Sequence, residues 1–437
     1  DHGRGLAREV IKIGPATMLR REYSRYRQFV KGRLPATAVN LERGPVELGK
    51  LGCLSYGFAG DRPFGTVQDL EEYYAGHSVR ELNQVLTRLM EPLDDRWYGQ
   101  SEPLLTNFAE EYDQHLPAHL RLTQATVSPY QNYRQAKHRL IDTEAILNAP
   151  NRLEIGEPIA IRDLKVTQVM PDEIKLTSTK DGPKIWIRAE IDFPQPDLQE
   201  GDRVNIWGVV KARRDDMLEQ VGERVMDTFP EMTRRPDGII HIREMDLTTP
   251  DPLAIYPILL NRQLDGRRAI IHGDLHPGNI LIDDAGRAWL IDFDHVREGH
   301  VLFDFIRLET ILRLFVLGKV RQIILQNRDK PAHDASSMAW TYPFSLAEYI
   351  NFEKTLLDQT LNRQPAIIPR PELAKAAELI LAIRQLAKPY LRATHNWHEY
   401  LNGLFLHNLA QLRFYELMPQ IAVLPLTTAA VVAGEIS

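Results

Sequence analysis

The sequence predicts an α+β protein with a small β-rich N-terminal lobe, a mainly helical C-terminal lobe and a small β-barrel inserted into this scaffold. Three observations lead to this prediction. A short strand pattern and a helix pattern open the chain, long stretches further on have helical spacing, and a run of about 60 residues alternates short apolar strands with turn residues. The 437 residues are enough for two or three packed units.

The N-terminal lobe is expected at residues 1–65. Residues 9–13 alternate like a strand, and residues 17–31 place apolar side chains on one side of a helix that ends near Gly32 and Pro35. The strand pattern starts almost at the first residue, which is not methionine. We therefore expect the opening strands of this lobe to be missing and the chain to be a fragment of a longer one.

The next two segments differ in their patterns. Residues 66–150 have helical spacing and are expected to form a helical part of the C-terminal lobe, whereas residues 151–215 form short strands separated by turn residues. Gly201 to Gly208 resembles the strand start common in OB-fold barrels, so we expect an OB-like barrel that acts in recognition rather than chemistry. The expected inward positions of the barrel are Ile159, Ile161, Val166, Ile174, Leu176, Ile185, Ile187, Val204, Ile206 and Val209.

Composition indicates a folded protein of the reducing cytoplasm. Hydrophobic residues make up 43% of the chain and charged residues 26%, and the formal net charge of −6 gives no general attraction to nucleic acid or anionic membrane. The single cysteine, Cys53, excludes an intramolecular disulfide framework. The apolar segment 421–433 is interrupted by Pro425 and two threonines, so we expect no membrane span.

The residues suited to chemistry lie between positions 270 and 294. Residues 270–282 have the pattern of a strand, a tight loop and a second strand, and residues 289–294 that of a third strand with an acidic end. Phosphoryl transfer needs a carboxylate beside the acceptor hydroxyl and oxygen ligands that hold magnesium against the phosphates. Asp274 in the loop fits the first role, and Asn279 and Asp292 fit the second.

The run His272-Gly-Asp-Leu-His-Pro-Gly-Asn279, followed by Ile291-Asp-Phe-Asp294, resembles the aminoglycoside phosphotransferase and choline kinase group. This group has the protein-kinase-like fold, so the resemblance implies a bilobal, ATP- and Mg2+-dependent phosphotransferase. It also implies that residues 216–437 form the rest of the C-terminal lobe, with the catalytic loop and the C-terminal helices.

The resemblance assigns roles to five residues of this chain. Asp274 matches the catalytic base, and Asn279 and Asp292 match the metal ligands. Lys12 resembles the strand lysine that contacts the phosphates of ATP, and Glu22 on the following helix is the residue expected to pair with it. The family's glycine-rich phosphate loop has no counterpart before Lys12, where only two glycines stand, so either the opening strands are missing or nucleotide binding is compromised.

Other residues near this run have roles that the sequence suggests less directly, and some of them have two possible interpretations. Asp304 resembles a buried aspartate that tethers the catalytic loop. Asp294 is either a second metal ligand or a strand cap, and His276 is either a packed loop residue or a catalyst. Glu9 and Glu42 remain alternative partners for the strand lysine.

Three functions are compatible with these patterns. The first is phosphoryl transfer to an unknown small-molecule or protein acceptor, whose pocket lies among the C-terminal helices near His395-Asn-Trp-His398, unless that cluster is helix packing. The second is a nucleotide-binding regulatory or pseudokinase module of a larger signalling or defence protein. The third is a barrel that binds a protein or nucleic-acid partner. The candidate basic surface of the barrel, or else a set of solvated strand ends, consists of Arg203, Trp207, Lys211, Arg213 and Arg214.

Overall fold

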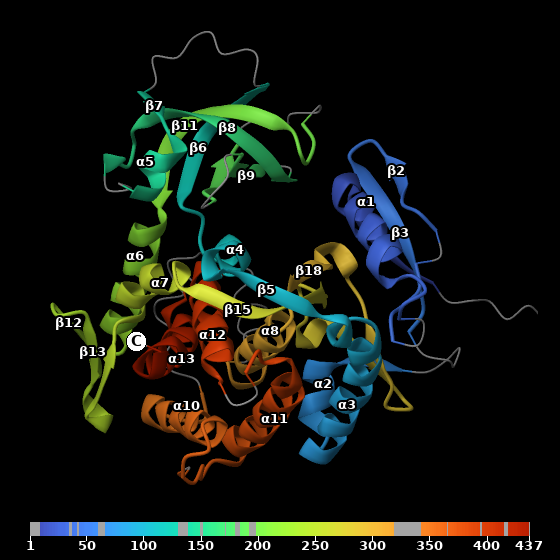
Figure 1. Ribbon diagram of the computed structural model, residues 1–437, viewed down its shortest axis with the longest axis vertical. Helices are drawn as coiled ribbons and strands as arrows, with labels where there is room; N and C mark the ends of the chain where they lie inside the picture. Colours follow the sequence, from blue (N-terminus) through green and yellow to red (C-terminus); the bar gives the residue numbers. More distant parts are fainter. Residues whose placement is uncertain are drawn as a thin grey trace, which may run out of the picture.

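The computed structural model describes residues 9–34, 37–41, 43–59, 66–129, 139–148, 152–170, 172–179, 184–191, 198–318, 342–364, 366–393, 396–414 and 418–436. These residues form a small β-rich lobe, a β-barrel and a larger helical lobe, which Figure 1 shows in blue, green and mainly orange to red. The predicted α+β fold with two lobes and an inserted barrel is confirmed.

The N-terminal lobe is a three-stranded antiparallel sheet with one helix on its inner face. The strands β1 (Glu9–Pro15), β2 (Val46–Leu48) and β3 (Leu51–Gly57) are arranged in the order β1-β3-β2. Helix α1 (Ala16–Arg25) follows β1 directly and continues as a π-helical turn, η1 (Tyr26–Val30). Lys12 lies opposite Leu54, which is fully buried, so the lysine side chain lies on the same face as α1.

The catalytic-loop region is built from two small antiparallel sheets. Strand β15 (Gln263–Ile271) pairs with β5 (Glu102–Asn107) and β18 (Arg297–His300). Strand β16 (Ile280–Asp283) pairs with β17 (Ala288–Leu290) and with the short strand β4 (Val67–Asp69). The predicted order of strand, loop, strand, turn and strand is confirmed, and it places the loop between the two sheets.

Amphipathic helices support these sheets. Helix α2 (Leu70–Gly76) precedes α3 (Val79–Arg96), which begins with a capping box between Ser78 and Glu81. One stripe of α3 is buried against the lobe, as its spacing predicts. The remaining C-lobe helices are α8 (Phe303–Leu312), its π-helical continuation η8 (Arg313–Leu317), α10 (Leu346–Thr360), α11 (Pro371–Ala387), α12 (His398–Gln411) and α13 (Pro419–Ile436).

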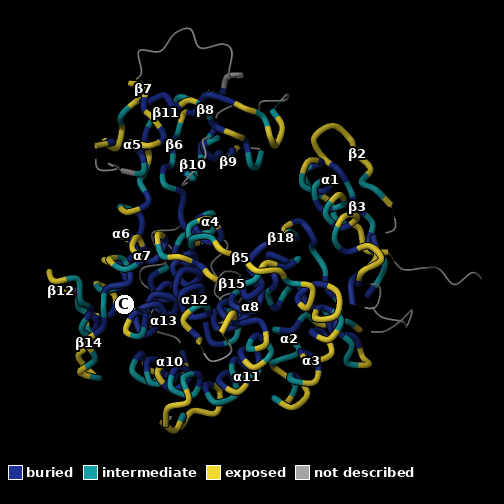
Figure 2. Tube along the Cα trace, in the orientation of Figure 1, coloured by how far each residue is buried: buried dark blue, intermediate teal, exposed yellow. Residues whose placement is uncertain are grey.

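The core of the helical lobe contains a buried ionic network. Figure 2 shows α8, α12 and α13 as the most deeply buried helices. Glu309 on α8 accepts hydrogen bonds from Arg384 on α11 at 3.0 and 2.6 Å, and from the Tyr400 hydroxyl at 2.5 Å. Arg313 lies 2.7 Å from both Glu309 and Glu353. Because each charge has a partner, the helices can bury it.

Helix α13 alone, among the described helices, is long and apolar enough to cross a membrane. In this structure 89% of its apolar window is buried inside the protein, against α12, α10 and α6 (Arg214–Thr228). Pro425 and the threonines that interrupt the segment lie within this helix. Its apolar composition is therefore accounted for by its place in the core of the lobe.

The barrel is closed by five strands. The ring order is β6-β10-β9-β8-β11, and β11 pairs with both β8 and β6. The barrel has a hydrophobic core of its own, and nine of the ten predicted inward positions are in it. Val209 is the exception: alternation from Val204 and Ile206 places Val210 inward, and Val210 is the buried residue. The strands are β6 (Leu120–Pro129), β8 (Pro158–Val169), β9 (Glu173–Ser178), β10 (Trp186–Glu190) and β11 (Arg203–Arg213).

The barrel begins earlier in the chain than the range 151–215. Its first strand, β6, falls within residues 66–150, for which the sequence predicts helical spacing, and it pairs in parallel with β10. A parallel pairing between distant segments leaves no local signal in the sequence. The other described elements are α4 (Phe108–Tyr112), β7 (Arg139–Ile141), α5 (Thr143–Asn148), β12 (Met232–Arg235), β13 (Ile239–Ile242), β14 (Leu247–Pro250) and α7 (Pro252–Leu260).

Candidate functional site

Lys12 joins the two lobes through a pair of carboxylates. Its Nζ atom lies 2.9 Å from Glu22 Oε2 and 3.0 Å from Asp292 Oδ1. Burial acts to lower the pKa of Lys12, but the charges of Glu22 and Asp292 outweigh it and raise that pKa. The lysine is therefore fully charged at neutral pH, and the structure brings it to Asp292, which lies 280 positions later in the sequence.

Glu22 also holds the loop that follows Asp292. Its side chain, on the buried face of α1, accepts a hydrogen bond from the backbone N–H of Phe293 at 3.2 Å and another from the Tyr56 hydroxyl. Asp292 itself has a left-handed backbone, with φ 63° and ψ 73°. A residue other than glycine adopts this conformation only where its surroundings hold it there. The contacts of Glu22 and Lys12 supply part of that constraint.

Asp274 lies in a loop that is anchored at its base by Asp304. The carboxylate of Asp304 accepts hydrogen bonds from the backbone N–H groups of His272 at 2.6 Å and Gly273 at 2.8 Å. It also accepts one from the Tyr98 hydroxyl at 2.9 Å. Asp304 is fully buried, so the predicted tether of the catalytic loop is present in the structure.

The loop also requires glycine at position 273. Gly273 has a φ of 74°, and a Cβ added there would lie 2.3 Å from the carbonyl oxygen of His295. Any larger residue would therefore push the loop away from the segment after Asp292. The imidazole of His272 adds a second link, since its Nε2 lies 3.0 Å from the carbonyl oxygen of Ile291.

Asn279 lies between the catalytic loop and the strand that leads to Asp292. Its side-chain NH2 donates to the backbone carbonyl oxygen of Asp274 at 2.9 Å. Its backbone carbonyl oxygen accepts a hydrogen bond from the backbone N–H of Ile291 at 3.2 Å. The Nδ2 atom is thus occupied by the loop, and Oδ1 remains the side-chain acceptor. Asn279 and Asp292 therefore start and end the same hairpin at its loop end.

Asp274 forms an ion pair that the sequence did not indicate. The guanidinium of Arg307 on α8 donates to its Oδ1, and His276 Nε2 lies 4.0 Å from its Oδ2. Burial acts to raise the pKa of Asp274, but the charge of Arg307, with smaller contributions from nearby histidines, lowers it overall. Asp274 is ionised at neutral pH, as a proton acceptor must be. Arg307 lies 33 residues after Asp274, so no local spacing in the sequence signals this pair.

Asp294 is held by Arg21 rather than placed toward a metal. Both of its oxygens accept hydrogen bonds from Arg21 on α1, through Nε at 2.6 Å and through Nη2. Nη1 of Arg21 also lies 3.2 Å from Oε2 of Glu200, which precedes strand β11 of the barrel. Arg21 therefore links the N-terminal lobe, the segment after Asp292 and the barrel. Neither reading of Asp294 anticipated this pair, because its partner lies 273 residues away.

Two other candidate clusters have ordinary structural partners. Trp397 is buried and packs edge-on against Tyr400, with ring centroids 5.7 Å apart, which favours helix packing near the expected acceptor pocket. His395 of the same cluster and Glu42, the alternative partner of Lys12, lie outside the described residues. Glu9 contacts Ser55 instead of Lys12.

The expected basic surface of the barrel is largely neutralised by its own carboxylates. Lys211 lies 2.5 Å from Glu190, and Arg213 lies 2.5 Å from Asp216. Arg214 is buried and pairs with Asp113 at 2.5 Å. Most of these cations therefore serve the packing of the barrel and its neighbouring helix.

Comparison with protein families gives one match, which spans most of the chain. The model described as ternary complex associated domain 9 matches residues 1–413. The chain belongs to this family. No curated protein gives a significant match to this member of the ternary complex associated domain 9 family. Among solved structures, it is similar to a glucosamine kinase (crystal form B) at 11% sequence identity and a TM-score of 0.38, over 96% of this chain and 71% of that one.

The site contains oxygen ligands of the kind that could hold magnesium. The described residues contain no group of three or more His, Cys, Asp or Glu side chains that could hold a metal ion. Magnesium is commonly bound through one or two protein oxygens together with phosphate oxygens and water. The Asp292 carboxylate, which contacts the charged Lys12, and Asn279 Oδ1 offer oxygen ligands of this kind.

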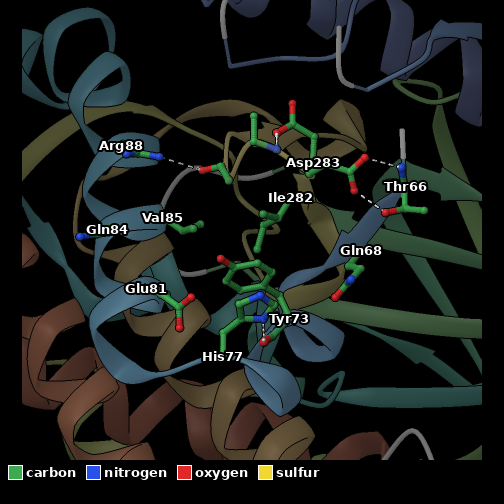
Figure 3. A pocket seen from close by; sticks show the side chains of 13 residues that line it. Thr66, Gln68, Tyr73, His77, Glu81, Gln84, Val85, Arg88, Ile282 and Asp283 are labelled. Atoms are coloured by element: carbon green, nitrogen blue, oxygen red, sulfur yellow. Dashed lines mark hydrogen bonds between the residues drawn. The ribbon is translucent and has the colours of Figure 1, made fainter. Parts of the chain in front are cut away.

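A separate hollow of about 440 Å³ lies at the other end of the β16–β17 hairpin (Figure 3). Tyr73 and His77 stack on one side of it, with ring centroids 3.6 Å apart. On the opposite side, Thr66 N–H donates to Asp284 at 3.0 Å and Arg88 donates to the Gly286 carbonyl at 3.4 Å. None of the predicted site residues lines this hollow.

Proposed function

We propose that this chain is an ATP- and Mg2+-dependent phosphotransferase. One observation carries the proposal: Lys12 bridges Glu22 and Asp292 at 2.9 and 3.0 Å, next to a tethered loop that presents Asp274. A strand lysine, its helix glutamate and a metal-binding aspartate must come together before a kinase-type site can act.

Each residue has a role that follows from its contacts. Lys12 neutralises phosphate charge, and Glu22 orients it. Asp292 and Asn279 are the residues that would hold Mg2+, which when bound neutralises charge on the phosphates. The acceptor hydroxyl attacks the γ-phosphorus and its proton passes to Asp274. The bond from the γ-phosphorus to ADP breaks, and ADP leaves with that electron pair.

Arg307 modifies the role of Asp274. Its guanidinium pairs with the carboxylate and keeps the pKa of Asp274 low, which makes the aspartate a weak base. The same guanidinium lies where negative charge is transferred, so it can stabilise the phosphoryl group while Asp274 orients the acceptor. The acceptor itself, a small molecule or a protein, is not fixed by these contacts.

A second function is favoured by the same ion pair. If Arg307 stays on Asp274, the chain binds nucleotide without transferring phosphate and serves as a regulatory or pseudokinase module. The family description, which refers to association with a ternary complex, supports a role within an assembly.

Transfer and binding can be separated by experiment. The test measures release of phosphate from γ-labelled ATP, together with Mg2+·ATP affinity, for the wild type, Asp274→Asn and the exposed control Glu298→Ala. We expect Asp274→Asn to bind Mg2+·ATP like the wild type and to lose about 100-fold or more of its turnover. Turnover that survives in Asp274→Asn would contradict the catalytic role. Tight binding without any turnover in the wild type would establish the regulatory module instead.

A further inference from the structure

Cationic side chains of the helical lobe and the barrel act on one another: the charges of Arg307 and Asp274 reach Arg413, and the charge of Arg413 reaches the barrel. From the helical lobe come Arg307 and Arg413, together with His407, whose Nε2 lies 3.5 Å from Arg307 Nη1. From the barrel comes Lys175 on β9. We call Lys175, Arg307 and Arg413 the cationic cluster. His407 is neutral, because burial and the neighbouring arginines lower its pKa well below its usual value.

The barrel side of the cluster is fixed by strand register. Lys175 lies directly opposite Arg188 on β10, so both side chains project from the same outer face of the barrel. Ile174 and Leu176, the neighbours of the lysine, point into the barrel core. Glu173 is on the outer face too, but it pairs with Arg188 at 2.7 Å.

Carboxylates are too few to balance these charges. Within the described part of the chain, Asp274 serves Arg307 and Glu173 serves Arg188. Neither Lys175 nor Arg413 forms an ion pair with a described residue. Both residues are half-buried, and cations partly withdrawn from water without a counter-charge are costly to a folded protein, which favours a bound anion.

Unused hydrogen-bond donors point the same way. Nε of Arg307 and Nε of Arg413 are buried and have no hydrogen-bond partner among the described residues, and Nδ1 of His407, which is 1% exposed, has none either. Nearly all buried polar groups in proteins have partners. Guanidinium N–H groups are best satisfied by phosphate or carboxylate oxygens, which accept two parallel bonds.

Mutual repulsion within the cluster agrees with the missing anion. Burial, with the charges of Arg413 and Arg188, lowers the pKa of Lys175 to about 8. Burial, followed by the charge of Arg307, lowers the pKa of Arg413 as well. An anion placed among these groups would reverse both effects.

We propose that the cationic cluster is the acceptor site and that the acceptor carries an oxyanion, a phosphate or a carboxylate group, in addition to the hydroxyl that is phosphorylated. This inference rests on the proposed phosphotransferase function. Arg413 and Lys175 hold the oxyanion, and Arg307 separates it from Asp274. A cationic acceptor such as an amino sugar would be repelled here, and the barrel supplies specificity through Lys175.

Inorganic phosphate is the probe for this site. Its binding is measured by 31P NMR in saturating Mg2+·ADP, so that the nucleotide site is already filled. The proteins compared are the wild type, Lys175→Ala, Arg413→Gln and the control Lys165→Ala, which removes an exposed lysine from β8 of the same barrel. Circular dichroism confirms that each variant is folded.

We expect Lys175→Ala and Arg413→Gln to weaken phosphate binding about tenfold, because each removes a charge-assisted contact. Lys165→Ala should bind phosphate like the wild type, and all four proteins should bind Mg2+·ADP equally. Malonate then competes with bound phosphate: displacement assigns carboxylate acceptors to the site, and no displacement assigns phosphate.

The two hypotheses fail in different ways. Equal phosphate binding by the wild type and Lys175→Ala, or no binding by either, overturns the anionic acceptor site while Mg2+·ADP still binds. Failure of Mg2+·ADP to bind the wild type overturns the phosphotransferase proposal. Phosphate binding is then measured without nucleotide, and it shows whether the cationic cluster binds an anion independently of that function.

Discussion

Replacing Asp304 with asparagine removes the charge that anchors the catalytic loop and leaves the shape of the side chain unchanged. Oδ2 accepts from the Tyr98 hydroxyl and the N–H of His272, and Oδ1 accepts from the N–H of Gly273. All three groups donate, so the side-chain NH2 introduced by Asp304→Asn would face a donor in either orientation. The substitution therefore breaks at least one bond and weakens the others.

The cost follows from the number of bonds. A hydrogen bond to a charged group contributes about 1.5–3 kcal/mol, so we expect Asp304→Asn to lower the free energy of unfolding by about 3 kcal/mol. Tyr98→Phe removes a single donor and should cost about half as much, which makes it a graded control. Urea denaturation followed by circular dichroism measures both values, and phosphate transfer should fall more than Mg2+·ATP affinity. An unfolding free energy of Asp304→Asn within about 0.5 kcal/mol of the wild type would refute the tether.

Three further predictions concern other charges. Burial acts to raise the pKa of Glu309, but the charge of Arg384 outweighs it and lowers that pKa to about 2. Glu309→Gln should therefore cost about 3–5 kcal/mol at pH 7, and urea titrations should show that the wild type loses this advantage as pH falls from about 4.5 toward 2. Lys175→Met should stabilise the ligand-free protein by about 1–2 kcal/mol at pH 7, after a discount for solvent contact. That gain should vanish as pH rises from about 8 to 10.5, where the folded wild type sheds the proton first. Glu22→Gln should weaken Mg2+·ATP binding about tenfold in calorimetry, because Lys12 loses the partner that orients it.

The candidate site residues of the C-terminal lobe could be proposed from the sequence because they lie in one short stretch. Asp274, Asn279 and Asp292 fall on a strand-loop-strand pattern in which local spacing sets geometry. Lys12 and Glu22 could be assigned from their order on a strand and the following helix. In the structure Lys12 contacts Glu22 at 2.9 Å and Asp292 at 3.0 Å, and the Asn279 side chain donates to the Asp274 carbonyl oxygen. The roles of these five residues stay predictions.

The residues that sequence reasoning missed make contacts between distant segments. Arg21 reaches Asp294 across 273 positions, and Arg307 reaches Asp274 only because α8 packs behind the catalytic loop. Arginine is common on helices, so the sequence alone does not single out Arg21 or Arg307. The first strand of the barrel was missed for the same reason, since its parallel partner β10 lies about 60 residues later.

Calorimetric titration of ATP tests the central claim most directly. The comparison uses the wild type, Asp292→Ala and the exposed-acid control Glu298→Ala, each with and without Mg2+. The account predicts Mg2+-dependent binding by the wild type and the control, and at least about tenfold weaker binding by Asp292→Ala, because the phosphates lose their metal anchor. Equal Mg2+·ATP affinity for the wild type and Asp292→Ala would contradict it.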